Sequence, residues 1–301
     1  MERRYRYLLL DVFTKKQLEG NPLAVFPDAE GLSANEMQRI AGELNLSETV
    51  FLTPPRTRGA LAKARIFTPR RELDFAGHPT VGAAYVLARE RDPGGEFAIE
   101  ENVGLIPIAR DRDEEGDERF WLTTPPLRFF QTVEAALAAR LLSLSVDDLA
   151  HGVPPQFVSA GSPLLFVALA SPEAVDRAEI VPAHLDDTGG DVDSVGTFVF
   201  ARKEPGSSCF DVYSRMFAPQ TGILEDPATG GATGPLAGYM LERGLLPRGR
   251  SLQFRSEQGR KMGRPSILHV RMGEDGTPIE VGGSVVSLAE GTMLMHQHDV
   301  Q

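Results

Sequence analysis

The stretch from Pro79 to about Arg89 constrains the fold more than any other part of the sequence. Its apolar side chains lie on nearly every side of a helix, so the helix has no face to offer to water. Pro79 suits the first helical position, because a first-turn N–H has no intrahelical acceptor in any case. Such a helix must be enclosed by other elements. We therefore predict a domain whose strands wrap around it.

A second helix of small residues is predicted from Thr229 to Arg243. Aligning Tyr85 with Tyr239 places Gly77 on Gly231, which is a faint internal repeat. Both helices begin in a glycine-bearing turn, where backbone N–H groups can bind an anion. The sequence thus indicates two similar halves, each with strands around one buried helix.

The halves are predicted to meet at Pro125-Pro126, and 301 residues suffice for about two domains. We expect an N-terminal domain of residues 1–126, completed by a C-terminal strand near 288–301. The C-terminal domain then covers residues 127–287. The predicted class is α+β, in which each domain is a curled, mostly antiparallel sheet around a central buried helix.

The composition argues against several classes of protein. A net charge of −11 and the absence of a basic run argue against nucleic-acid binding. Cys209 is the one cysteine, which excludes an intramolecular disulfide and two-thiol epimerase chemistry, and its strand context predicts a buried thiol. No stretch approaches the ~18 apolar residues of a membrane span, and no signal-peptide pattern is present. We expect a cytoplasmic protein without nucleic-acid or membrane partners.

Glu48 is predicted to stand between a helix and a strand. Ser33 followed by Glu36 forms a capping box, which starts a helix that ends near Leu44. A strand is predicted over 49–52, directly after Glu48. By itself this position predicts only a solvated or turn-pairing carboxylate.

Other residues with useful chemistry also allow two interpretations. His78 could bind a ligand or transfer a proton, but a lone histidine at a helix start is more often bonded to backbone. Asp74 and Asp226 precede the two helices and could simply cap them. Gly230 and Gly231 could cradle an anion or only ease the helix start. The glycine pattern matches neither a dinucleotide-binding motif nor a P-loop.

The chain resembles the phenazine-biosynthesis isomerase (PhzF-like) family, which has the diaminopimelate-epimerase fold. The motifs that carry this resemblance occur in family order over almost the whole chain. They are Asp11-Val12-Phe13-Thr14, Gly20-Asn21-Pro22-Leu23-Ala24-Val25, Leu46-Ser47-Glu48-Thr49, Phe67-Thr68-Pro69, Asp74-Phe75-Ala76-Gly77-His78-Pro79-Thr80, Glu225-Asp226-Pro227-Ala228-Thr229-Gly230, Gly263-Arg264-Pro265-Ser266 and Val281-Gly282-Gly283.

The resemblance implies a cofactor-independent and metal-independent isomerase with a site in a cleft between two similar domains. It implies that Glu48 is the catalytic acid/base and that His78 and Asp226 assist it. It also implies a small acidic substrate and a homodimer. The expected substrate-binding residues are Asn21, Asp74, Gly77, Gly230, Gly231 and Ala232.

One position departs from the family pattern. Many members have serine where this chain has Gly231, so a substrate-contacting hydroxyl is lost here. The substrate is therefore expected to differ from the cyclic amino acid that the best-known member isomerises. Two other functions stay open: an amino-acid racemase using Glu48 and Asp226, and a non-catalytic binding protein that retains the fold.

Overall fold

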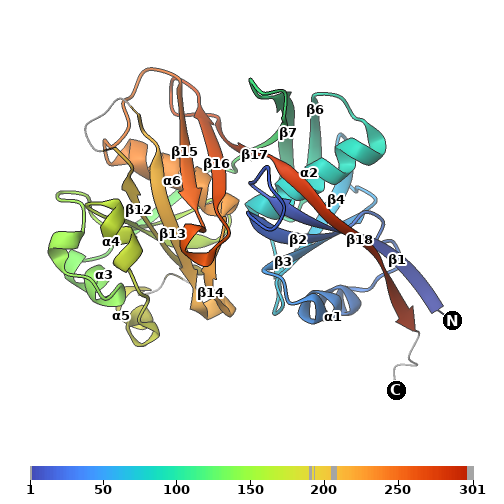
Figure 1. The fold of residues 1–301 in the computed structure, drawn as a ribbon, viewed down its shortest axis with the longest axis horizontal. Coiled ribbons are helices and arrows are strands. Elements are labelled where there is room, and N and C mark those ends of the chain that lie inside the picture. The colour runs from blue at the N-terminus through green and yellow to red at the C-terminus, as the bar shows by residue number, and fades with distance from the viewer. Residues whose placement is uncertain (1, 190–191, 193, 205–208, 297–301) are drawn as a thin grey trace. The chain divides into compact units, whose positions relative to one another are not determined.

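The computed structural model describes residues 2–189, 192, 194–204 and 209–296, and it divides into two compact units (Figure 1). Unit 1 comprises residues 1–122 and 284–301, and unit 2 comprises residues 123–283. The last strand, β18 (Val285–His296), belongs to unit 1 and pairs antiparallel with β1 (Glu2–Val12) along its whole length. The last five residues of the predicted strand 288–301, residues 297–301, lie outside the described residues.

Unit 1 is one curled sheet with two helices. Its remaining elements are β2 (Asn21–Phe26), α1 (Ala34–Leu44), β3 (Glu48–Thr53), β4 (Ala62–Phe67), β5 (Glu72–Leu73), α2 (Gly77–Arg91), β6 (Glu96–Glu101), β7 (Gly104–Arg112) and β8 (Glu118–Thr123). Neighbouring strands follow the order β18-β1-β2-β3-β4-β6-β7-β8. The pairs β2–β3 and β4–β6 are parallel, and the others in this order are antiparallel.

Unit 2 has the same construction with more helices. Its elements are β9 (Arg128–Thr132), α3 (Ala135–Leu141), η1 (Val146–Asp148), β10 (Gln156–Ser159), β11 (Pro163–Ala168), α4 (Pro172–Arg177), η2 (Pro182–His184), α5 (Leu185–Gly189), β12 (Gly196–Arg202), β13 (Val212–Ala218), η3 (Pro219–Thr221), β14 (Ile223–Asp226), α6 (Gly230–Glu242), β15 (Leu252–Gln258), η4 (Arg260–Met262), β16 (Ser266–Met272) and β17 (Ile279–Gly283). Its strands follow the order β9-β10-β11-β12-β13-β15-β16-β17, with β11–β12 and β13–β15 parallel.

The two strand orders match pair by pair, including both parallel pairs, so the internal repeat is real. Its register differs by one residue from the sequence alignment. Thr80 Oγ1 donates to Ala76 O at 2.6 Å, and Thr233 Oγ1 donates to Thr229 O at 3.0 Å. The two helices therefore align Thr80 with Thr233, which places Tyr85 on Gly238. Small residues match at several shifts, so the sequence alone could not fix this register.

Both long helices of the repeat are buried. In α2 every residue from Gly77 to Ala88 is buried, which confirms the central enclosed helix. The helix begins at Gly77 and not at Pro79, because the turn that carries His78 is already helical. A Cβ atom on Gly82 would lie 2.3 Å from Leu23 Cδ2, so glycine permits the close approach of α2 to β2. In unit 2, α6 packs into a core that includes Phe166, Phe198 and Phe200.

Two further findings concern exposure. Cys209 is exposed and precedes β13, so the prediction of a buried strand thiol was wrong. The strand begins at Val212, and Cys209, Phe210 and Asp211 precede it outside the sheet. None of the helices among the described residues is long and apolar enough to cross a membrane.

Gly20 offers a direct test of the turn between β1 and β2. Its φ is +68°, and an added Cβ would lie 2.4 Å from the carbonyl oxygen of Val12. Gly59 has a similar φ of +95° with open space around it. Because only Gly20 adds steric overlap to the shared backbone strain, Gly20→Ala should cost about 1–3 kcal/mol more unfolding free energy than Gly59→Ala. Urea denaturation measures both values, and equal costs would contradict the packing described for this turn.

Candidate functional site

Three predicted residues of unit 1 lie together. Asn21 begins β2, Glu48 begins β3, and His78 is the second residue of α2. The parallel pairing of β2 with β3 brings the first two strand starts to one edge of the sheet. Asn21 Nδ2 lies 3.3 Å from His78 Nδ1, and His78 Nε2 lies 3.4 Å from Glu48 Oε2. The imidazole therefore stands between an amide and a carboxylate.

The backbone explains why Glu48 lies at this position. Ser33 caps α1 through the predicted capping box with Glu36, and Asn45 ends the helix in a left-handed conformation. The chain reverses there and enters β3 at Glu48. The Glu48 side chain is 14% exposed, and its Oε2, the oxygen nearest His78, is itself buried.

A fourth residue, Ser47, fixes the proton positions. Its Oγ donates to Asn21 Oδ1 at 3.0 Å, so the Asn21 amide turns Nδ2 toward His78. An amide nitrogen only donates, so Nδ1 of His78 must accept, and the imidazole proton sits on Nε2. That N–H lies on the Glu48 side and has no hydrogen-bond acceptor of suitable geometry among the described residues.

Burial keeps the His78 imidazole neutral. The residue is 3% exposed, and desolvation lowers the pKa of its imidazole from 6.5 to about 3. At neutral pH the ring is therefore an uncharged imidazole that donates through Nε2, and it is not an imidazolium cation.

The start of α2 adds backbone donors. The first backbone amide of α2 that donates to a preceding carbonyl is Thr80 N, which lies 3.2 Å from Ala76 O. Pro79 has no N–H. The N–H groups of Gly77 and His78 therefore have no acceptor within the helix. Asp74, which precedes the helix, is exposed, and its backbone carbonyl accepts from Val103 N.

In unit 2, Asp226 ends β14 and lies in a tightly bonded turn. Its Oδ2 accepts from Thr229 Oγ1 at 2.5 Å. Gln258, the last residue of β15, donates from Nε2 to Asp226 O at 2.7 Å and to Thr229 Oγ1 at 2.9 Å. Thr229 N in turn donates to Gln258 Oε1 at 3.1 Å. The buried amide of Gln258 thus holds both ends of the turn from Asp226 to Thr229.

A buried arginine holds the residue before Asp226. Arg215 on β13 forms a two-fold ion pair with Glu225, at 2.9 and 2.8 Å. The same guanidinium donates to the backbone carbonyls of Val175 and Ala178, so it ties β14 to α4. Gln258 and Arg215 were not found by the sequence analysis, because neither belongs to a motif with recognisable chemistry.

The first turn of α6 offers fewer free amides than expected. Ala232 N donates to Thr229 O at 3.0 Å, as does Thr233 N at 3.1 Å. The N–H groups without an intrahelical acceptor are therefore those of Gly230 and Gly231.

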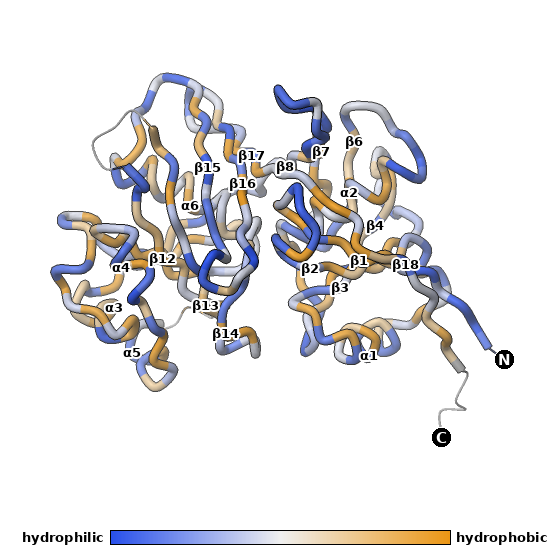
Figure 2. The backbone as a smooth tube through the Cα atoms, viewed as in Figure 1, coloured by the Kyte–Doolittle hydropathy of each residue, from blue (hydrophilic) through white to orange (hydrophobic). Residues whose placement is uncertain are grey.

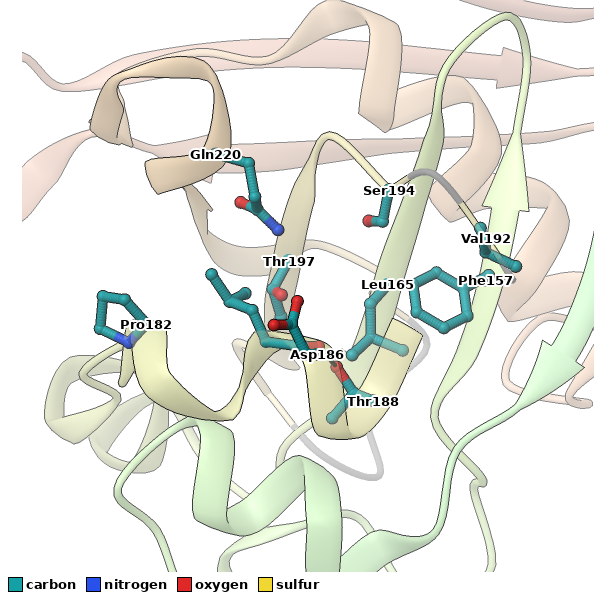
Figure 3. Close-up of a pocket in the computed structure, with 10 residues that line it drawn as sticks. Phe157, Leu165, Pro182, Asp186, Thr188, Val192, Ser194, Thr197 and Gln220 are labelled. Atoms are coloured by element: carbon teal, nitrogen blue, oxygen red, sulfur yellow. Dashed lines mark hydrogen bonds between the residues drawn. The ribbon is translucent and has the colours of Figure 1, made fainter. Parts of the chain in front are cut away.

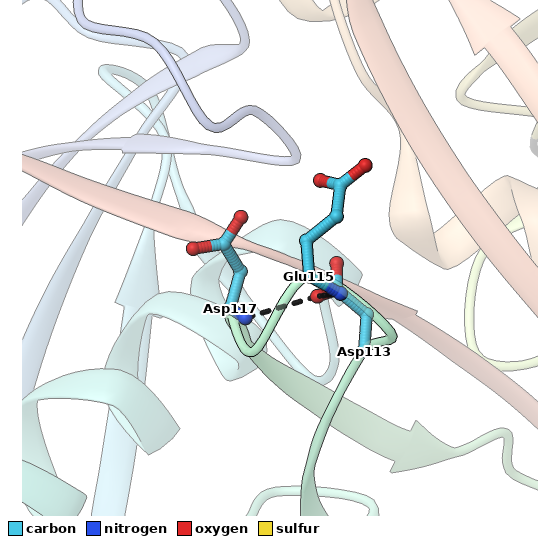
Figure 4. Close-up of side chains that lie close together, drawn as sticks. All are labelled: Asp113, Glu115 and Asp117. Atoms are coloured by element: carbon cyan, nitrogen blue, oxygen red, sulfur yellow. Dashed lines mark hydrogen bonds between the residues drawn. The ribbon is translucent and has the colours of Figure 1, made fainter.

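One group of three carboxylates among the described residues has metal-ligand spacing, Asp113, Glu115 and Asp117 (Figure 4). They lie in the hydrophilic loop that follows β7 (Figure 2). The ammonium of Lys15 contacts all three, at 2.7 Å from Asp113 and 2.8 Å from Asp117. This ion pairing lowers the pKa of Asp113 to about 2 and raises that of Lys15. A lysine therefore already supplies the cation at this cluster.

Unit 2 also contains a pocket of about 410 Å³ (Figure 3). It is lined by the apolar side chains of Phe157 and Leu165 and by the polar side chains of Thr197 and Gln220, among others. None of the predicted site residues lines it.

Comparison with known protein families fits these motifs and this geometry. The model of the phenazine biosynthesis-like proteins matches residues 10–291. The chain belongs to the PhzF family. This finding confirms the resemblance drawn from the motifs around Glu48, His78 and Asp226.

Relatives of the PhzF family are informative about activity and fold. A trans-2,3-dihydro-3-hydroxyanthranilate isomerase of Pseudomonas aeruginosa is 35% identical over 293 residues, covering 95% of this chain and 98% of the relative. A PhzF family protein of Bacillus anthracis has a TM-score of 0.86 at 25% identity, over 97% of this chain and 100% of the other. A hydroxyproline epimerase from Agrobacterium vitis shares the fold, with a TM-score of 0.64 at 12% identity over 97% and 93%. This PhzF family member is an isomerase that acts on a small metabolite.

The neutral state of His78 can be tested by nitrogen NMR. Because burial lowers its pKa to about 3, the His78 ring should not titrate between about pH 5 and 8 in the folded protein. Its spectrum should show the proton on Nε2 throughout. The signal is assigned by its loss in His78→Asn. In urea the same ring should titrate near its ordinary value of about 6.5, and a folded-state midpoint near that value would contradict the assignment.

Proposed function

We propose that this isomerase moves a proton on a small carboxylate-bearing metabolite by general acid/base catalysis, without a cofactor, and that Glu48 is the base. The observation that carries the proposal is the hydrogen-bonded series Ser47–Asn21–His78, which directs a neutral imidazole N–H toward the side of Glu48. A carboxylate on a partly exposed side chain, with one oxygen buried beside a fixed donor, suits a group that must gain and release a proton.

In this proposal the backbone amides hold the substrate acid. The N–H groups of Gly77 and His78 in unit 1, and of Gly230 and Gly231 in unit 2, lack intrahelical acceptors. Helix starts with such free amides attract carboxylates. With a net charge of −11, the protein must provide its anion site locally, and these amides meet that need. We assign substrate contacts also to Asn21, Asp226, the exposed Asp74 and Ala232, whose N–H donates to Thr229 O.

The proton balance is closed within the site. The Glu48 carboxylate takes a proton from a substrate carbon and becomes a carboxylic acid, and the substrate anion is delocalised toward its unsaturated or carbonyl neighbour. Glu48 then returns the proton to another carbon of the same system, which is a 1,3 shift. No oxidant or second reactant is required. The compound named for the Pseudomonas relative, trans-2,3-dihydro-3-hydroxyanthranilate, is the first candidate to assay.

The sequence left two other functions open, and only one of them still competes with this proposal. The non-catalytic binding protein is set aside, because relatives over the whole chain are named isomerases. A racemase that uses Glu48 and Asp226 as two bases remains a competing mechanism. Asp226 is 6% exposed and its Oδ2 is occupied by Thr229, which suits a positioning role better than a second base. The homodimer and the cytoplasmic location stay predictions.

The role of Glu48 is tested by deuterium exchange. Substrate or a close analogue is incubated in D₂O with wild type, Glu48→Gln and Glu43→Gln, an exposed glutamate on α1 that serves as the matched control. Loss of the base should slow exchange about 10²–10⁴-fold in Glu48→Gln only. Equal exchange by Glu48→Gln and wild type would eliminate Glu48 as the base.

Asp226→Asn separates the two mechanisms. If Asp226 positions substrate, the variant should slow exchange equally from both directions of the reaction, because one base serves both. A racemase with two bases should lose exchange for one enantiomer and keep it for the other. Proton NMR of each purified enantiomer or isomer in D₂O gives the two rates, and a one-sided loss would favour the racemase.

A further inference from the structure

Glu101 is a buried carboxyl group that the proposed reaction does not use. It ends β6 and is 2% exposed. Its Oε1 lies 2.5 Å from Thr80 Oγ1, and the carboxyl group also receives a hydrogen bond from the backbone of Ala76. Ala76 and Thr80 bracket the first turn of α2, so Glu101 lies against the backbone that carries Gly77 and His78.

The contacts of Thr80 indicate where the proton is. Its Oγ1 lies 2.6 Å from Ala76 O and 2.5 Å from Glu101 Oε1, yet a hydroxyl has one proton to donate. A carbonyl oxygen and a carboxylate oxygen both only accept. Both short contacts are satisfied when Glu101 carries a proton and donates to Thr80, which then donates to Ala76 O.

The other oxygen of Glu101 points to the same state. Glu101 Oε2 is buried and makes no hydrogen bond among the described residues. An ionised carboxylate with one oxygen desolvated and unpartnered is costly, whereas the carbonyl oxygen of a neutral acid loses much less.

The internal repeat supplies an independent comparison. The parallel strands β4 and β6 place Lys63 opposite Glu100 in unit 1, and the equivalent strands β13 and β15 place Tyr213 opposite Glu257 in unit 2. The next residues, Glu101 and Gln258, are therefore equivalent. Gln258 Oε1 accepts from Thr229 N, just as Glu101 accepts from the backbone of Ala76. Unit 2 thus fills this position with a neutral amide, and a protonated carboxyl is the closest match to it.

We propose that Glu101 is a positioning residue that acts as a neutral carboxylic acid, fastening the first turn of α2 through Thr80 and Ala76. The effect on catalysis rests on the proposed function, because it is exerted through Gly77 and His78. Ionisation of Glu101 would leave the Thr80 hydroxyl with two competing acceptors and loosen this turn.

The surrounding charges agree with a neutral group. Burial raises the pKa of Glu101 to about 8, and the bonds from Thr80 and Ala76 oppose this rise only in part. Among the described residues no charged side chain contributes to that shift. Glu100, on the opposite face of β6, accepts hydrogen bonds from the backbone N–H groups of Arg56 and Thr57. It also forms an ion pair with Lys63. On α2, the helix start favours the anion, and the nearby His78 is neutral.

The sign of the pH dependence follows. The pKa of Glu101 is higher in the folded than in the unfolded protein, so its contribution to stability is full below the ordinary carboxyl pKa. That contribution is lost as the pH rises from there through about 8. Glu101→Gln keeps a neutral donor and should remove this slope.

Infrared spectroscopy tests the proton directly and needs no substrate. At pH 7 the wild-type protein should show the C=O stretch of a protonated carboxylic acid, which should fade as the pH is raised through about 8. The band should be absent from Glu101→Gln and present in the control Glu100→Gln. A wild-type spectrum without the band, or its persistence in Glu101→Gln, would overturn the proposal. If Glu101→Gln fails to fold, the pH titration of the wild-type band still decides.

Activity gives the second readout. Deuterium exchange by wild type should decline between pH 7 and 9 relative to Glu101→Gln, because Glu101 ionises over that range. The thermal midpoints of the two proteins should diverge from about pH 5 up to about pH 8 and change in parallel above it. Parallel pH profiles would overturn the positioning role. If neither wild type nor Glu101→Gln exchanges deuterium at any pH, the proposed function is wrong. The infrared result would still show whether Glu101 is protonated.

Discussion

Burial of α2 on all sides, from Gly77 to Ala88, determines what the rest of unit 1 can be. A helix without a polar face needs apolar partners all around it, and the curled sheet from β18 to β8 supplies them. Side chains along the helix are then committed to packing. Only the helix ends keep groups with unused hydrogen-bonding capacity. In unit 1 such groups lie in the first turn of α2, where His78 Nε2 is 3.4 Å from Glu48 Oε2 and the amides of Gly77 and His78 have no acceptor within the helix.

The two units share this scaffold but not its chemistry. In unit 1 the strand starts carry Asn21 and Glu48, and the helix start carries an imidazole. In unit 2 the position equivalent to Glu48 is Gly196, the first residue of β12, and the helix start has Gly231 in place of His78. The repeat therefore supplies one half with the carboxylate that we propose transfers the proton, and the other with a hydrogen-bonded turn at the start of α6. Arg215 and Gln258 hold that turn through hydrogen bonds to Glu225 and to Asp226 O, respectively.

Much of this could be read from the sequence. The enclosed helices, the capping box at Ser33 and the place of Glu48 all followed from local patterns, and the family followed from motifs. What the sequence could not give is long-range pairing. Glu101 meets Thr80, and Gln258 meets Thr229, only because parallel strand pairs bring them there. The burial of Cys209 was misjudged because a short apolar run does not reveal where a strand begins. The group of three carboxylates is ion-paired with Lys15, a hundred residues away from Glu115, and no sequence-spacing rule detects such a pair.

The place of β18 has a consequence for how the chain acquires its structure during synthesis. Unit 2 is continuous, from residue 123 to 283, whereas unit 1 needs both ends of the chain. β1 precedes the other described strands, and β18, one of its two sheet partners, follows them, so one side of β1 stays unpaired until residues 285–296 have been synthesised. Until then the eleven residues of β1 form an exposed sheet edge. Unit 2 can fold before β18 is synthesised, whereas the sheet of the unit that carries Glu48 is completed only when β18 pairs with β1.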